Sequence, residues 1–89
     1  MSDYTKEFLE LAHKNSFCNK VDVLAGSLCG CFYCNATFLP TDIVEWIIEE
    51  TGETAICPNC SVDSVLSSKW PVTNPLFLTG MNLFWFRVI

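Results

Sequence analysis

Four of the six cysteines occur as two pairs, and the members of each pair are separated by two residues. The first pair is Cys31 and Cys34, the second is Cys57 and Cys60, and residues 35–56 lie between them. Two intervening residues let both sulfurs of a pair reach one metal ion from a tight turn. Two such turns supply four thiolates, a ligand set typical of a structural, tetrahedral zinc ion. The spacing therefore predicts one structural Zn²⁺ site made of these four cysteines.

The residues of the two turns agree with this interpretation. Pro58 stiffens the second turn, and Asn35, directly after Cys34, tolerates the left-handed backbone conformation that such turns often need. Iron in a rubredoxin-like cage uses the same four sulfurs and stays open as an alternative. Four free, buried cysteines without a metal are a second alternative.

The two remaining cysteines have no comparable spacing. Cys29 precedes Cys31 by two residues and competes with it as a ligand, but the C-G-C pattern favours Cys31. Cys18 has no local partner and is expected to be a small buried apolar residue. A redox role for Cys29, or a disulfide between Cys18 and Cys29, stays open at this point.

The pattern does not favour catalysis. A catalytic zinc ion keeps an open coordination position, commonly beside histidine ligands, whereas four thiolates close the shell. The only histidine is His13, expected to be a partly solvated helix residue, with a fifth metal ligand or an acid–base role as the alternatives. Asp63, close to the second pair, is expected to cap a turn or to bind a partner. The sequence therefore predicts a protein that is not an enzyme.

Composition narrows the function classes further. The chain has 89 residues and a formal net charge of −5, and its five basic residues are scattered singly, so nucleic-acid binding is not expected. The first residues are polar and acidic, which does not fit a secretion signal, and reduced thiols in paired spacing fit the cytoplasm. The apolar stretch 75–89 is too short for a membrane-spanning helix, so no membrane contact is expected.

The hydrophobic pattern predicts the elements that must position the cysteines. We expect one zinc-binding domain over residues 1–89, because a chain this short has room for a single core. Its fold class is small α+β, with a zinc-ribbon-like or treble-clef-like pair of cysteine knuckles and about three helices. A strand-like or irregular segment is expected over 15–30, with Val21, Val23 and Leu24 as a β-prone patch. The predicted elements are a helix over 3–14 with Asp3 as its cap, a first knuckle over 29–38, a helix over 41–51 ending at Gly52, a second knuckle over 54–66, and a helix over 75–87.

The last helix carries more apolar surface than a small core can cover. Asn74 and Pro75 predict its start. One stripe is expected to pack on the domain: Phe77, Met81, Phe84, Trp85 and Val88. We therefore expect a protein partner or a second copy on the remaining surface. The candidate partner-binding residues are Asp63, Trp70, Leu76, Leu83 and Phe86.

At these residues the sequence resembles a family of short bacterial proteins, uncharacterised cytoplasmic proteins with a zinc-ribbon-like pattern. The sequence pattern of this family begins with C-F-Y-C, followed by F-x-P and a helix containing I and W. It continues with T-A-L-C-P-x-C-G-I-D-S-V-I and ends with M and W-F. The resemblance covers about residues 29–86 and implies a cytoplasmic protein with these four ligands, but no known activity. Ser61 stands where the family has glycine, so the turn after the second pair is expected to differ slightly. The matching residues are Cys31-Phe32-Tyr33-Cys34, Phe38, Pro40, Ile43, Trp46, Thr54-Ala55-Ile56-Cys57-Pro58, Cys60, Val62-Asp63-Ser64-Val65, Met81, Trp85 and Phe86.

Three functions remain open on the sequence alone. The leading hypothesis is a non-enzymatic protein-interaction module whose fold is fixed by zinc. The second is a small electron-transfer or thiol redox protein, with iron in the same cage or with a reactive Cys29. The third is an inhibitor of a host enzyme encoded by a phage or mobile element, which small size and acidity permit.

Overall fold

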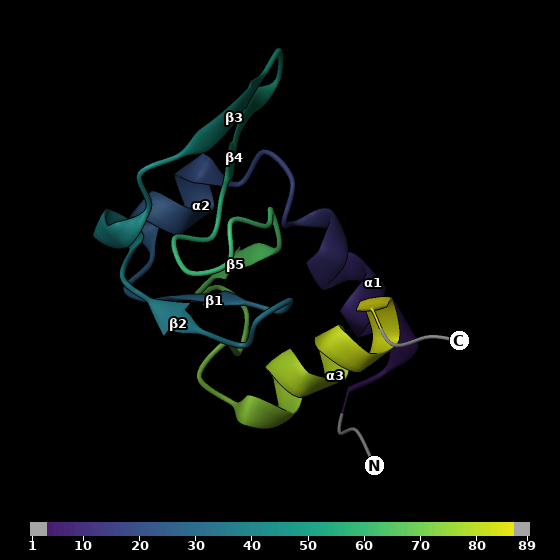
Figure 1. Cartoon of the computed structure of the whole chain (residues 1–89). Helices are drawn as coiled ribbons and strands as arrows, with labels where there is room; N and C mark the ends of the chain where they lie inside the picture. Colours follow the sequence, from purple (N-terminus) through teal and green to yellow (C-terminus); the bar gives the residue numbers. More distant parts are fainter. Residues whose placement is uncertain (1–3, 87–89) are drawn as a thin grey trace.

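A computed structural model describes residues 4–86, which form an α+β fold with three α-helices and two antiparallel sheets (Figure 1). Within these residues, no helix has both the length and the apolar character needed to cross a bilayer. In chain order the elements are α1 (Lys6–Lys14), α2 (Lys20–Ala25), β1 (Cys29–Cys31), β2 (Thr37–Phe38), the 3₁₀ turn η1 (Pro40–Asp42), β3 (Trp46–Glu49), β4 (Gly52–Ala55), β5 (Val65–Ser67) and α3 (Pro75–Phe86).

The first and last helices were predicted in nearly the right places. In α1 the cap is Thr5, whose hydroxyl oxygen accepts a hydrogen bond from the Phe8 amide at 3.1 Å, so the helix begins after the expected position. The expected cap, Asp3, lies outside the described residues. In α3 the Asn74 side chain accepts from the Leu76 amide at 3.0 Å, and Pro75 occupies the first helical position as predicted.

The prediction of a helix over 41–51 was wrong. The carboxylate of Asp42 accepts a hydrogen bond from the Leu39 amide at 3.0 Å and so stabilises the start of a helical turn. Only one 3₁₀ turn, Pro40–Asp42, follows. The chain then forms the hairpin of β3 and β4, with Gly52 beginning the second strand at φ +157° instead of ending a helix. Ile43, Val44, Ile47 and Ile48 are stiff β-branched side chains, which favour extended backbone once a partner strand is available.

A second correction concerns the segment after α1. The β-prone patch Val21, Val23 and Leu24 lies in the short helix α2, where only Val23 is buried. The backbone oxygen of Asn19 accepts the first bond of this helix, from the Val23 amide at 2.9 Å. Packing of α2 beside β4 and β5 therefore overrides the local strand propensity.

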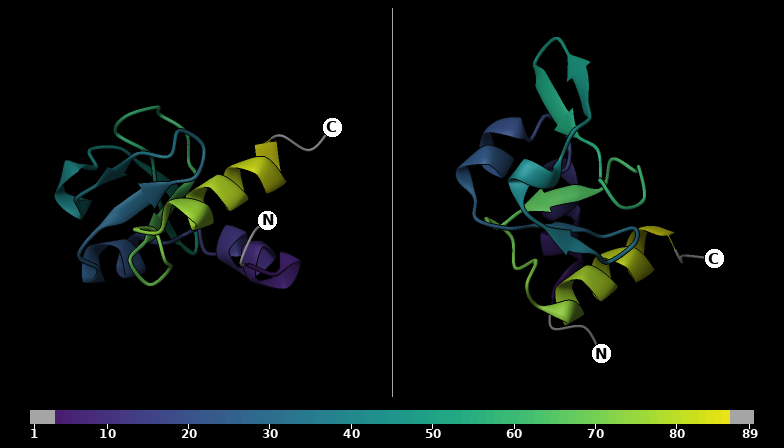
Figure 2. Two further views of the ribbon diagram at one scale, coloured as in Figure 1. Left: turned by 90° about the horizontal axis from the view of Figure 1, so that it is seen from below. Right: turned by 60° about the vertical axis from the view of Figure 1, so that its left-hand side comes forward.

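The two sheets share no strand. The first has the order β2-β1-β5, with Cys29 opposite both Phe38 and Ser67, and the second contains only β3 and β4. The hairpin of β3 and β4 extends away from the rest of the fold, as both Figure 1 and the right-hand view of Figure 2 show. The second cysteine pair lies in the connection between β4 and β5, so this connection joins the two sheets.

Two groups of buried side chains form the interior. One lies between α1, α3 and the first sheet and is built around Phe32, Leu66, Phe77 and Met81. Trp70 belongs to this group, with 8% of its surface exposed and its ring in edge contact with Phe8 at 5.3 Å. Its prediction as a partner-binding residue was therefore wrong: its apolar ring is already used inside the fold. The other group surrounds the cysteines and includes Val23, Cys29, Ile43, Ala55 and Val65.

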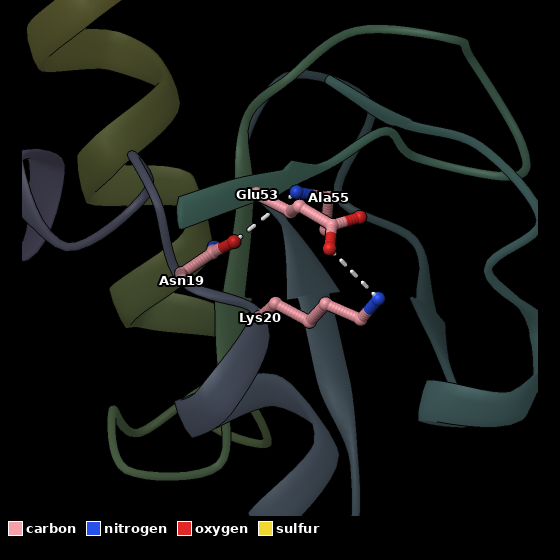
Figure 3. Close-up of polar contacts among 4 residues, drawn as sticks. All are labelled: Asn19, Lys20, Glu53 and Ala55. Carbon is pink, nitrogen blue, oxygen red and sulfur yellow. Dashed lines mark hydrogen bonds and ion pairs between the residues drawn. The ribbon is translucent and has the colours of Figure 1, made fainter. Parts of the chain in front are cut away.

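Asn19 bridges the two sheets where no backbone ladder exists. Its side-chain amide donates to the carbonyl oxygen of Val65 in β5 at 2.7 Å, and its side-chain oxygen accepts from the amide of Ala55 in β4 at 3.1 Å. Figure 3 shows the second contact beside the ion pair of Lys20 and Glu53, which measures 3.1 Å. Asn19 is buried, whereas this ion pair is about one-third exposed.

We predict that Asn19→Ala destabilises the fold by about 2–4 kcal/mol, because it leaves a buried donor and a buried acceptor without partners. Lys20→Ala, at the next position, is the matched control and should cost less than about 1 kcal/mol, since the pair it breaks is partly solvated. Urea unfolding of the two metal-loaded variants measures both values. Equal losses in the two variants would contradict the bridging role of Asn19.

Candidate metal centre

The structure brings the four predicted cysteines into one cluster. The Sγ atoms of Cys31, Cys34, Cys57 and Cys60 all lie within 4.8 Å of one another, with 3.6 Å between Cys31 and Cys60 and 3.8 Å between Cys34 and Cys57. Four sulfurs at ~2.3 Å from a tetrahedral zinc ion are separated by about 3.8 Å, whereas a disulfide bond measures ~2.05 Å. All six cysteines are free. The spacing therefore fits a metal ion shared by four thiolates.

Both cysteine pairs have the same backbone turn. The amide of Asn35 donates to the carbonyl of Cys31 at 2.8 Å, and the amide of Ser61 donates to the carbonyl of Cys57 at 2.9 Å. In each turn the amide of the first cysteine then donates to a carbonyl five residues later, Ala36 or Val62, at 2.9 Å. Asn35 and Ser61 have φ values of 63° and 67°. The left-handed conformation predicted for Asn35 is confirmed, and Ser61 repeats it.

Asn59 is a site residue that the sequence analysis did not single out. Its backbone amide donates to the sulfur of Cys57 at 3.3 Å, and its side-chain amide donates to the sulfur of Cys34 at 3.4 Å. The amide of Cys60 also donates to the Cys57 sulfur, at 3.4 Å. Hydrogen bonds of this kind stabilise thiolate charge and hold the two turns in register. The only sequence signal was an amide side chain between two ligands.

Burial divides the four thiols into two kinds. Cys31 and Cys57 are buried, whereas Cys34 and Cys60 are partly exposed. Burial raises the pKa of Cys31 and of Cys60, although backbone hydrogen bonds oppose it in both cases. Burial also tends to raise the pKa of Cys34, but the hydrogen bonds from Asn59 and Ala36 outweigh this effect and lower the pKa to about 7. Without a metal ion, the cluster therefore holds protons at neutral pH.

The two other cysteines lie outside the cluster. Cys29 is fully buried in β1 opposite Ser67, and burial, followed by the nearby charge of Asp42, raises its pKa to about 11. Cys18 is only partly buried, at φ 50°, with its sulfur 3.3 Å from the hydroxyl oxygen of Thr51. Both thiols are free, so the alternative of a disulfide between them was wrong.

The remaining site residues are spread over the surface. Asp63 lies beside a groove of about 400 Å³ that is also lined by His13, Lys14 and Phe86. His13 is exposed and stacks on Trp85 with 4.1 Å between ring centroids, away from the sulfur cluster. On α3, Leu76, Leu83 and Phe86 are exposed as expected. Phe77 and Met81 of the same helix are buried, which confirms the predicted inward face; Val88 lies outside the described residues.

Comparison with known proteins gives no further assignment. No protein-family model matches the chain, no characterised protein is significantly similar to it, and no solved structure matches its fold. The resemblance to the short bacterial family therefore stays a prediction, and the function must be argued from the sulfur cluster itself.

We predict that Ser61→Gly stabilises the metal-loaded protein by about 0.5 kcal/mol. A left-handed conformation costs a non-glycine residue about 1–2 kcal/mol, and the greater freedom of glycine in the unfolded chain offsets part of the gain. Ser61→Ala, which also removes the hydroxyl but keeps the strain, is the control and should not stabilise. Thermal unfolding with zinc in excess distinguishes them, and a destabilised glycine variant would contradict the argument.

Metal binding should release protons at pH 7, because the pKa values of Cys31 and Cys60 are raised and both thiols must lose a proton to bind. Affinity should accordingly fall as the pH is lowered, by about tenfold per pH unit for each proton displaced. Calorimetric titration of zinc in buffers of different ionisation enthalpy counts the protons. A binding enthalpy that is independent of the buffer would show that the thiols were already ionised.

Proposed function

We propose that this protein is a non-enzymatic interaction module in which Cys31, Cys34, Cys57 and Cys60 hold one structural zinc ion. The observation that carries the proposal is the sulfur cluster, in which two turns with the same backbone hydrogen-bond pattern bring four sulfurs within 4.8 Å of one another. Four thiolates complete a tetrahedral shell and leave no position for water or substrate. Such a site stabilises a fold and does not activate a nucleophile.

The position of the cluster supports a structural role. β4 enters the second cysteine turn and β5 leaves it, yet these strands belong to different sheets and exchange no backbone ladder. The first cysteine turn connects β1 and β2, which belong to the same sheet as β5. A metal ion bound by both turns would therefore cross-link the two sheets. In a chain of 89 residues such a cross-link contributes free energy that the small core lacks.

The interaction role is supported by apolar side chains left on the surface. Leu76 and Leu83 lie on the outer side of α3 and are about half exposed. Ile48 in β3 and Val44, two residues before β3, are about four-fifths exposed. Within the described residues the one cluster of metal-ligating side chains is that of the four sulfurs, and the proposed metal uses them all. Partner binding through these surfaces is therefore a better-supported activity than catalysis.

We predict that the purified protein contains about one zinc ion per chain and that Cys57→Ser loses it and unfolds. Cys18→Ser is the matched control and should keep both metal and fold, because Cys18 lies outside the cluster. Elemental analysis by mass spectrometry with circular dichroism of the same samples gives both readouts. Iron as the bound metal, seen as a red protein, would favour the electron-transfer alternative, and full metal retention in Cys57→Ser would exclude this cage.

A further inference from the structure

The outer edge of β3 is a free strand edge. β3 pairs only with β4, and the second sheet contains these two strands alone within residues 4–86. The residues from Ile47 to Glu50 are exposed, and the turn end of the hairpin extends beyond the helices and the first sheet (Figure 1). Natural edge strands are often blocked by proline, by a bulge or by charged side chains. β3 has no proline and no bulge, and its one charged side chain is Glu49.

The backbone groups available on this edge follow from the register. The Glu45 carbonyl accepts from the Ile56 amide at 3.1 Å, and Ile47 lies opposite Thr54, so the odd-numbered residues turn their polar groups toward β4. In an antiparallel pair this orientation alternates along the strand. Val44, Trp46 and Ile48 therefore turn their amide and carbonyl groups outward. No hydrogen bond within the described residues uses these groups.

The side chains of the edge have a defined pattern. Val44 and Ile48 are about 80% exposed, and Trp46, on the same face, is anchored under the Lys20 ammonium at 5.1 Å. The other face presents Glu45, Ile47 and Glu49 in alternation. Residues 44–55 contain four glutamates and no basic residue. Of these four, only Glu53 has an ion-pair partner in the described part of the chain.

This charge pattern argues against a second copy of the same strand as the occupant. Two-fold pairing through the outward groups of Trp46 and Ile48 has three possible centres, at residue 46, 47 or 48. In each of them Glu45 and Glu49 of one copy lie directly opposite or diagonal to the same glutamates of the other copy. Like charges at these positions are unfavourable. A strand with basic residues at the facing positions is complementary instead.

We propose that the β3 edge is a docking site for an extended segment of a partner protein that adds a strand to the hairpin. The segment has basic residues at two positions separated by three residues, where they face Glu45 and Glu49, and apolar residues between them that cover Ile47 and Ile48. Backbone hydrogen bonds to Trp46 and Ile48 provide the pairing, and the alternate side chains provide the specificity. The inference rests on the proposed interaction role and names its site and partner chemistry.

The direct test is a titration of the zinc-loaded, isotope-labelled protein with the peptide acetyl-Ser-Lys-Val-Ile-Val-Lys-Ser-amide. We expect the largest amide shifts at Val44, Trp46 and Ile48, and weaker binding at high ionic strength because the contacting charges are exposed. A peptide of the same composition with adjacent lysines is the control for attraction by charge alone. Equal binding of the two peptides, or shifts centred on α3, would overturn the proposal while leaving the metal site unaffected.

Two variants separate backbone pairing from charge. Ile48→Pro removes an outward amide without removing a hydrogen bond of the hairpin and should weaken peptide binding at least about tenfold. The double variant Glu45→Lys with Glu49→Lys should weaken it about tenfold and should now prefer the peptide in which both lysines are glutamates. Zinc content and the amide spectrum of the first sheet confirm that each variant is folded. Unchanged affinity in both folded variants would exclude the edge of β3 as the site.

Discussion

The described structure depends on how two sheets that share no strand are held together. The chain passes from β4 to β5 through the second cysteine turn, and the first turn lies between β1 and β2. Sulfurs from these two turns approach to 3.6 and 3.8 Å, close to the separation expected around one tetrahedral metal ion. A metal ion bound by this cluster would cross-link the sheets, and Asn19 is the one side chain within residues 4–86 that forms hydrogen bonds with both β4 and β5.

The second level of organisation is the pair of matching turns. A C-x-x-C turn requires the residue after the second cysteine to be left-handed, and the chain fills this position with asparagine in one turn and serine in the other. Asn59 then connects the turns through its two amide groups, one to each. The backbone and amide hydrogen bonds thus orient the four sulfurs toward one another, which favours binding of a single metal ion between the two turns.

The cysteine cluster could be predicted from the sequence because its signal is local: two ligands three positions apart define a turn by themselves. The helix α3 was predictable for the same reason, through Asn74 and Pro75 at its start and an apolar stripe, whereas for α1 the position was nearly right but the cap is Thr5. The segment 41–51 carried helix-start signals, with Thr41 as a suitable cap and Asp42 in the first turn, and also a run of β-branched residues, and local rules cannot rank these signals. Its strand conformation depends on a partner strand, which is a tertiary contact. Asn19 and Asn59 were missed because an amide bridging distant segments leaves no periodic pattern.

The metal centre and the hairpin are physically coupled, since β4 leads directly into the second cysteine turn through Ile56. Binding of zinc by four thiolates makes the protein more negative than its formal charge of −5, because four thiolate charges outweigh the two of the ion. The same event that fixes β4 therefore strengthens the negative field around a hairpin that already carries four glutamates. The basic partner strand proposed for this edge would gain from both effects, through a more rigid edge and a stronger attraction. The proposed structural metal would in this way govern partner binding without contacting the partner.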